Sequence, residues 1–254
     1  MKHRSLQAAL MVAVLLGGWH PAAAQVRAWE DRVFAGVSFG VEAGTEEASQ
    51  TRSFAIYGET ASLVSNSSFD RNTIVDLTLG ARVWKNLGVA LAYHTGTADG
   101  SAELSGSVPH PLFFDRPRNF SERVSGFERK EHATHLQIGW MLPLSDALDV
   151  FVYAGPSFYR VSQDVVSDLS VGEQGFPFAN VVVSPSYAVA KRNATGYNAG
   201  VDATYMLYTT DAVRLGVGGF LRVTGASTTL RAGDSTIETD LGGVQFGIGA
   251  RVRF

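Results

Sequence analysis

The sequence predicts an all-β protein, an antiparallel up-and-down transmembrane β-barrel. The chain begins like an exported protein, stretches that alternate apolar with small or polar residues recur along it, and the last of them ends on Phe254. Side chains of a strand point alternately to its two faces, so each stretch has one apolar face. In a membrane barrel that face contacts lipid and the other faces the lumen. A soluble secreted β-sandwich is the alternative, because an apolar face also suits a core.

Residues 1–24 have the composition of a cleaved signal peptide. Lys2 and Arg4 make a basic start, residues 6–16 are apolar apart from Gln7, and residues 22–24 are three alanines at the expected cleavage site. The apolar run is too short to cross a bilayer as a helix. We therefore expect residues 25–254 to form the mature barrel.

Charge and cysteine content exclude several classes of function. Removing Lys2 and Arg4 with the signal reduces 21 basic residues to 19 against 24 acidic ones, a net charge of −5. This mild acidity predicts no nucleic-acid partner. The chain contains no cysteine, which excludes disulfides and thiolate chemistry.

The alternating stretches give nine candidate strands. They cover residues 33–41, 53–63, 73–84, 87 to about 105, 131–142, 148–165, 187–207, 213–230 and from about 239 to the end.

The connections between these strands alternate in length. Short turns are expected at 85–86, 143–147 and 208–212, and long segments near 107–130 and 168–186. Because bacterial barrels have short periplasmic turns and longer external loops, the two long segments are predicted to be external and the carboxy terminus periplasmic.

Nine is an odd number, whereas single-chain bacterial barrels have even strand numbers. Counting back from a periplasmic carboxy terminus favours eight strands that begin near Ser53, which leaves residues 33–41 over. Ten strands remain the alternative, with one strand undetected.

The alternation places charged side chains inside the predicted lumen. The eight residues assigned there are Asp76, Arg82, Glu131, Asp202, Arg214, Arg222, Arg251 and Arg253. Charges in so narrow a space must pair, since an isolated buried charge is costly. We expect either a plug of ion pairs that stiffens the barrel or a narrow path for ions lined by the same pairs.

Histidines are the candidates for chemistry inside the barrel. His94 and His135 are expected to face inward and His132 outward, so His132 and His135 are poorly placed to share one metal ion. A Ser/His/acid set can be assembled from either inward histidine and Glu131, but a serine-rich chain always offers one. No phosphate loop, zinc motif or nucleophile elbow occurs, so the sequence predicts no catalytic residue, metal or cofactor.

The predicted external segments combine aromatic and basic residues. Exposed aromatics beside arginines can bind a partner or the phosphates of surface lipopolysaccharide. Alternatively, they pack on one another and brace a β-extension above the membrane. The binding candidates are Phe113, Phe114, Arg116, Arg118, Phe120, Phe176 and Phe178.

The closing stretch 249–254 and the hairpin 80–89 resemble the small outer-membrane barrel superfamily typified by OmpA and OmpX. This resemblance implies an outer-membrane location in a Gram-negative-type bacterium and insertion by the barrel-assembly machinery, which reads the terminal aromatic strand ending at Phe254. It also implies a role in envelope integrity, adhesion or limited permeation. We expect no soluble peptidoglycan-binding domain, so anchoring to the cell wall is not implied, and no motif of the barrel enzymes is matched.

The sequence as a whole favours a non-enzymatic outer-membrane barrel with a structural or surface-interaction role, in contact with outer-membrane lipid. A small pore for ions or solutes is one alternative, and a lipid-modifying or proteolytic barrel enzyme is another. Tyr93, Trp140 and Tyr205 are expected on the outer wall as part of an aromatic girdle.

Overall fold

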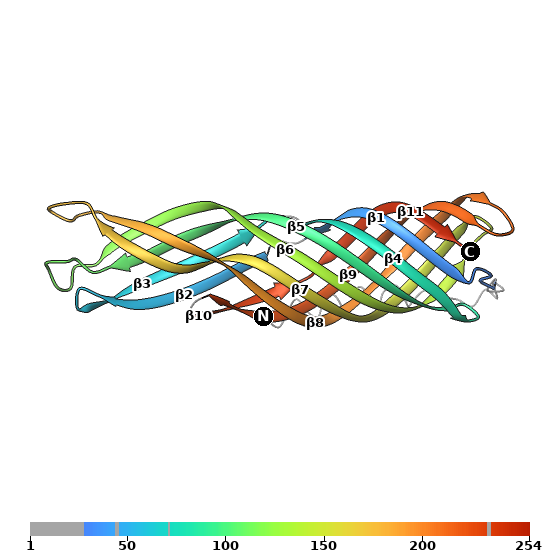
Figure 1. The fold of residues 1–254 in the computed structure, drawn as a ribbon, viewed down its shortest axis with the longest axis horizontal. Coiled ribbons are helices and arrows are strands. Elements are labelled where there is room, and N and C mark those ends of the chain that lie inside the picture. Colours follow the sequence, from blue (N-terminus) through green and yellow to red (C-terminus); the bar gives the residue numbers. More distant parts are fainter. Residues whose placement is uncertain (1–27, 44–45, 71, 233–234) are drawn as a thin grey trace, which may run out of the picture.

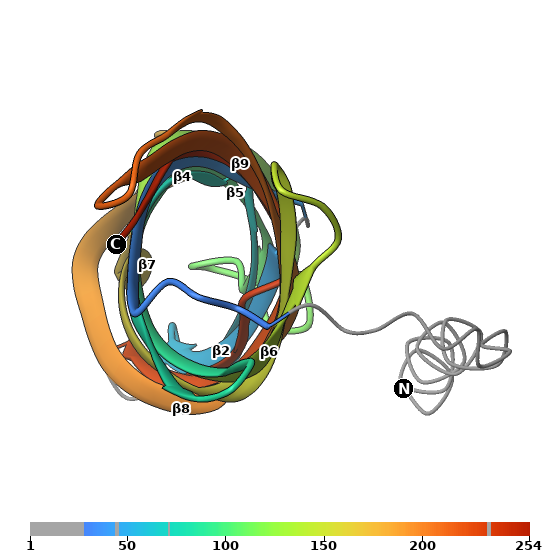
Figure 2. The ribbon, with the colours of Figure 1, turned by 90° about the vertical axis from the view of Figure 1, so that its right-hand side faces the viewer.

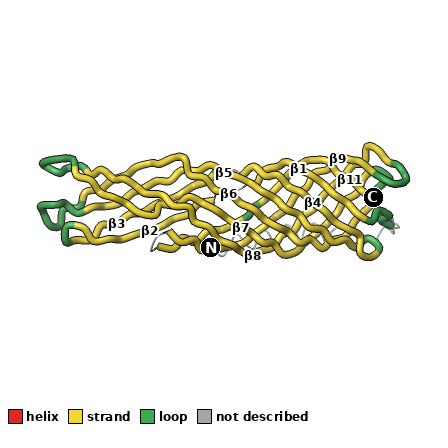
Figure 3. The backbone as a smooth tube through the Cα atoms, viewed as in Figure 1, coloured by secondary structure: helices red, strands yellow, loops and turns green. Residues whose placement is uncertain are grey.

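The computed structural model describes residues 28–43, 46–70, 72–232 and 235–254. The predicted signal peptide lies outside the described residues. All regular structure in the described ranges is β-strand, and the long axis of the molecule follows the strands (Figures 1 and 3). No helix of the described chain is long and apolar enough to cross a membrane.

The strands form one antiparallel sheet. They are β1 (Val33–Ala43), β2 (Glu46–Ile56), β3 (Glu59–Phe69), β4 (Asn72–Trp84), β5 (Leu87–Val108), β6 (Arg118–Pro143), β7 (Leu148–Glu173), β8 (Val181–Thr209), β9 (Arg214–Ala232), β10 (Ser235–Leu241) and β11 (Val244–Arg253).

Within the described residues, eight strands close into a ring in the order β1-β4-β5-β6-β7-β8-β9-β11 (Figure 2). The ring closes where β1 pairs with β11, from Phe34 opposite Arg253 to Ala43 opposite Val244. Closure satisfies the backbone groups that an open sheet edge would expose to lipid. The predicted fold class and the preferred number of eight strands are confirmed.

The assignment of the first strand was wrong. Residues 53–63 are not one strand but the end of a hairpin, with its turn at Tyr57 and Gly58, whose φ angles are 54° and 78°. A two-residue turn with both φ values positive matches the twist of a hairpin, but Tyr is an unusual residue there, so the sequence did not reveal it. Residues 33–41 therefore belong to the first strand and close the barrel.

The strands on one side of the barrel extend far beyond a bilayer. β6, β7 and β8 contain 26, 26 and 29 residues, whereas about 9–11 residues cross a membrane. The segments predicted as long loops are therefore mostly strand, and the connections are residues 109–117 and 174–180. The alternation fades there because a strand outside the membrane needs no apolar outer face.

The outer wall near the carboxy-terminal end is apolar. Leu79 is 60% exposed and Ile248 is 75% exposed, while Arg251 and Arg253 of the closing strand are buried inside. The predicted orientation of the closing strand is thus confirmed. Large apolar residues that cover a whole band of surface indicate contact with lipid hydrocarbon.

Candidate functional site: lumen, outer wall and external tip

The middle of the lumen is crossed by two ion pairs among the residues predicted from sequence. Arg222 Nη2 on β9 lies 2.7 Å from Asp76 Oδ2 on β4, and Arg251 Nη2 on β11 lies 2.6 Å from Asp202 Oδ2 on β8. Between the two pairs lies a small cavity of about 20 Å³ that Phe34 also lines. Each buried charge has its counter-charge on another strand, so each pair connects two strands that are not neighbours in the wall.

A second group of ion pairs lies toward the carboxy-terminal end. Arg253 Nη1 lies 2.6 Å from Asp149 Oδ2, and Arg214 Nη1 lies 2.9 Å from Asp31 Oδ2. Sequence analysis missed Asp31 and Asp149. Asp149 could have been found, because it lies two residues before the buried Phe151 of β7 and therefore points to the same face. Asp31 precedes the first strand, so the alternation of a strand gives no information on its position.

The residues before β1 fold into this mouth of the barrel. Trp29 is 1% exposed, and its indole Nε1 donates to Asp31 Oδ2 at 3.2 Å. Arg82, the remaining basic residue of the predicted set, donates to the carbonyl oxygen of Trp29 rather than to a carboxylate. An aromatic side chain therefore lies buried inside the mouth, next to the ion pairs.

A chain of polar side chains continues along the other part of the lumen. His94 Nδ1 and His135 Nε2 are 2.9 Å apart, and His135 Nδ1 is 2.7 Å from Ser157 Oγ. His94 Nε2 lies 3.8 Å from Oε1 of Glu131, and all four side chains are buried. The structure thus brings together the inward histidines and Glu131. Because Ser157 is fully enclosed, its hydroxyl lacks the access that an attacking nucleophile requires.

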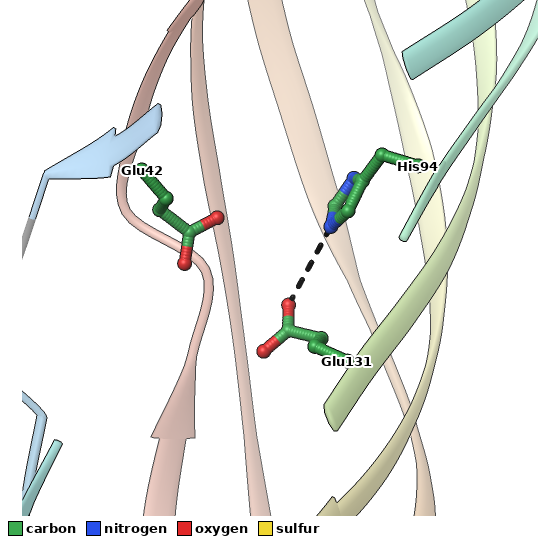
Figure 4. A group of neighbouring side chains, drawn as sticks. All are labelled: Glu42, His94 and Glu131. Atoms are coloured by element: carbon green, nitrogen blue, oxygen red, sulfur yellow. Dashed lines mark ion pairs between the residues drawn. The ribbon is translucent and has the colours of Figure 1, made fainter. Parts of the chain in front are cut away.

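Glu42 joins this group and was also missed by sequence analysis. It is the last inward residue of β1, and its carboxylate faces His94 and Glu131 across the lumen (Figure 4). The expected end of the strand at Val41 excluded Glu42 from the lumen set.

The end of the barrel that the long strands β6, β7 and β8 form is organised by one buried ion pair. Arg118 Nη2 lies 2.7 Å from Glu173 Oε1, and Arg118 also donates to the carbonyl oxygens of Pro109 and Phe178 at 2.8 and 2.9 Å. Tyr57 Oη donates to Glu173 Oε1 at 2.9 Å. The pair therefore ties together three connections of the described residues at this end, which we call the tip: turn 57–58 and loops 109–117 and 174–180.

Electrostatics at the tip follow from this contact. The hydrogen bond from Arg118 lowers the pKa of Glu173, and the same bond raises the pKa of Arg118. Both shifts favour the charged forms, so the contact remains an ion pair at neutral pH.

The aromatic candidates divide into two groups. Phe113, Phe114 and Phe176 are 53%, 75% and 84% exposed, and Arg116 lies over the ring of Phe113 at 5.4 Å. The other predicted candidates face inward: Arg118 is 8% exposed, Phe120 packs against a buried cluster, and Phe178 is half-buried. The tip thus combines both expected arrangements, an exposed aromatic surface and an internally braced extension.

The outer wall changes from apolar to basic across β5–β8. Tyr93, Thr134, Phe158 and Thr195 are cross-strand neighbours in one row, and the next row contains His132, Arg160 and Asn193. The row above contains Lys130 and Lys191. Cations directly beyond an aromatic row are placed at the depth of lipid phosphates. We call these residues the basic rows.

Comparison with known proteins supports the fold. No family model matches the chain, and no curated protein matches its sequence. Among solved structures, the outer membrane protein OprG from Pseudomonas aeruginosa is similar with a TM-score of 0.50 and 10% identity, over 88% of this chain and 96% of that chain. Neisserial surface protein A has a TM-score of 0.41 and 11% identity, over 87% and 97%. The outer membrane protease OmpT from Escherichia coli has a TM-score of 0.41 and 10% identity, over 92% and 99%.

These features define a class of protein. A closed eight-stranded ring, an apolar outer wall and a polar, paired lumen are the characteristics of a small outer-membrane β-barrel of Gram-negative type.

Proposed function

We propose that this barrel acts without catalysis at the cell surface, where its tip binds an external partner. The observation that carries the proposal is the Arg118–Glu173 pair, which fixes two loops and presents Phe113, Phe114 and Phe176 to solvent. Holding large aromatics in water is unfavourable unless a partner covers them.

The composition of the tip supports recognition. Aromatic residues and arginine are enriched in protein interfaces, and their contribution is greatest when they are held in position before binding. Asp115 N donates to Glu59 Oε1 at 2.9 Å, so the loop that contains Phe113 and Arg116 is also anchored to β3. The exposed aromatics are thus carried on a braced support.

We assign the lumen charges a structural role in the same proposal. The Asp76–Arg222 and Asp202–Arg251 pairs connect strands that are not neighbours in the wall, and Trp29 is buried inside the mouth. These contacts favour a rigid plug over the alternative of a small pore. The enclosed Ser157 likewise gives the alternative of a barrel enzyme no support.

Membrane lipid is the second partner that we propose. The basic rows suit the phosphates of an outer-leaflet lipid such as lipopolysaccharide, with Tyr93 and Phe158 against its acyl chains. During assembly we expect the barrel-assembly machinery to read Phe254, whose side chain is 54% exposed on the outer wall.

Adhesion of whole cells tests the role of the tip. Cells that carry the native chain are compared with cells that carry the triple change Phe113→Ser, Phe114→Ser and Phe176→Ser, on surfaces coated with laminin or fibronectin and on uncoated hydrophobic plastic. We expect the triple variant to reduce retention on at least one surface. Arg116→Ala is expected to weaken the same retention, whereas Arg123→Ala on the wall of the extension is the matched control.

The folded state of each variant is checked by the gel mobility of heated and unheated samples. Unchanged retention of a correctly folded triple variant on every surface would contradict the adhesive role. Discrete conductance steps in planar bilayers that change with Asp76→Ala would favour the pore instead.

A further inference from the structure

We propose that Glu42, His94 and Glu131 bind a divalent transition-metal cation in the lumen, with Zn²⁺ as the best match to these donors. This site is independent of the tip and of its partner.

The three side chains come from three strands. Glu42 lies at the end of β1, His94 on β5 and Glu131 on β6, and the candidate ligand atoms are all within 4.8 Å of one another (Figure 4). Two donors of a tetrahedral Zn²⁺ lie about 3.4 Å apart, given bonds of about 2.0–2.2 Å. His94 Nε2 and Glu131 Oε1, at 3.8 Å, are close to this spacing, and rotation of the flexible Glu42 side chain by about an ångström would complete the set.

Two of these donors point into the site without a hydrogen bond. His94 Nε2 and Glu131 Oε1 are buried and lack a hydrogen-bond partner among the described residues. They lie 3.8 Å apart, which is too long for a hydrogen bond. Burying a polar atom without a hydrogen-bond partner costs free energy, because its bonds to water are lost and not replaced. One cation coordinated by both atoms would remove this cost for each of them.

The hydrogen bonds behind His94 suit a metal ligand. When His94 Nδ1 donates to His135 Nε2 at 2.9 Å, His135 Nδ1 can donate to Ser157 Oγ at 2.7 Å. In this tautomer the lone pair of His94 Nε2 faces Glu131. Metal-bound histidines typically donate their second ring N–H to a neighbouring acceptor, which fixes the ring and its tautomer.

The local charge also favours a cation. Arg129 Nη2 pairs with Oε2 of Glu131 at 3.2 Å, which leaves Oε1 for another ligand. Glu42 accepts a hydrogen bond from the amide of Gln245, and its carboxylate is buried close to that of Glu131. Two buried carboxylates close together are costly when both are ionised, and a bound cation would reduce that cost.

The donor set selects the kind of metal. One imidazole and two carboxylates suit Zn²⁺ and its first-row neighbours better than Ca²⁺, which takes oxygen ligands alone. Glu42, Glu131 and Asn72 also line a cavity of about 20 Å³, which is enough for one water molecule as a further ligand. The ion would link β1 to β5 and β6. Neither of these strands is hydrogen-bonded to β1 in the barrel wall.

Calorimetric titration of the untagged barrel in detergent, after treatment with a chelator, tests the site with ZnCl₂ as the probe. We expect one Zn²⁺ per chain and a rise in the thermal midpoint with Zn²⁺ concentration, because an ion that binds the folded state stabilises it. Glu42→Gln and His94→Gln are each expected to weaken binding by about tenfold or more. His132→Gln, on the outward face of β6 beside Glu131, is the matched control and is expected to bind normally.

X-ray absorption of the Zn²⁺-loaded native chain keeps the test valid if a ligand variant does not fold. The expected first shell contains one imidazole nitrogen, with oxygen donors in the other positions. Absence of stoichiometric binding, a shell with two or more imidazoles, or loss of binding in His132→Gln would overturn the proposal.

Discussion

Arg222 and Asp76 meet across the lumen with 2.7 Å between Nη2 and Oδ2, although 146 residues separate them in the chain. Both side chains are nearly inaccessible to solvent, and Arg222 Nε also donates to Gln245 Oε1 at 2.7 Å. The contact connects β4 with β9, which are not neighbours in the barrel wall. It therefore braces the barrel across its interior.

Removing one charge of this pair is expected to lower the free energy of unfolding more than removing both charges. Asp76→Asn leaves the Arg222 charge buried and uncompensated, which we expect to lower the free energy of unfolding by about 3–5 kcal/mol. The double variant Asp76→Asn/Arg222→Met should lose less, because no charge is left unpaired. Urea unfolding in detergent, followed by tryptophan fluorescence, measures both. Equal losses in the single and double variants would argue against a pair that acts as a unit.

The tip is expected to loosen in acid. Because the hydrogen bond from Arg118 lowers the pKa of Glu173 below the ordinary value of a glutamate, the contact contributes stability above that ordinary value and loses it as the pH falls through the lowered pKa of the folded state. Hydrogen exchange of residues 109–117 and 174–180 should therefore accelerate below about pH 4.5 relative to β5, after correction for intrinsic rates. In Glu173→Gln, exchange should already be faster at neutral pH, by about tenfold, and should lack the acid transition. An acid transition that persists in this variant would assign the effect to another group.

Closure of the barrel depends on a small residue at Gly249. A Cβ at this position would lie 1.8 Å from the carbonyl oxygen of Val37 on the paired strand β1. We expect Gly249→Val to prevent pairing of β1 with β11, so that little protein reaches the folded band on an unheated gel. Ala250→Val, whose side chain faces lipid, is the control and should fold. Normal folding of Gly249→Val would show that the β1–β11 seam tolerates displacement.

The basic rows predict selective retention of phosphorylated lipid. Replacing Lys130, Arg160 and Lys191 with Ala removes three cations that surround one exposed groove of the wall. We expect the triple variant to copurify with less lipopolysaccharide, measured as phosphate per folded protein, because charge-assisted contacts to phosphate are lost. Lys85→Ala changes a cation at the opposite end of the barrel and should leave the ratio unchanged. An unchanged ratio in the triple variant would place the lipid elsewhere.

Much of the fold was predictable because lipid contact imposes a local rule. Alternation in residues 244–254 gave the correct inward and outward faces, and the same parity correctly placed His94 and His135 inside. The alternation rule does not apply to the parts of the strands outside the membrane, because they do not contact lipid. Beyond the membrane neither face must be apolar, so residues 118–130 were expected to be loop although they continue β6.

The site residues divide in the same way. Alternation along the strands showed that Arg222 and Asp76 face inward. It gave no information on which charges form pairs, because pairing depends on the tilt and register of strands far apart in sequence. Glu42 was missed because the expected strand ended one residue too early. Arg118 was expected at the surface because an arginine among phenylalanines gives no sign that Glu173 lies opposite.

The sequence by itself determined the class of fold and the faces of the closing strand, because both follow from alternation along single strands. Only the tertiary structure decided that residues 33–41 close the ring, that Asp31 and Asp149 neutralise the basic mouth, and that Glu42 meets His94 and Glu131. These are contacts between segments far apart in the chain. Their geometry is fixed by strand register around a closed barrel, which no local pattern of residues specifies.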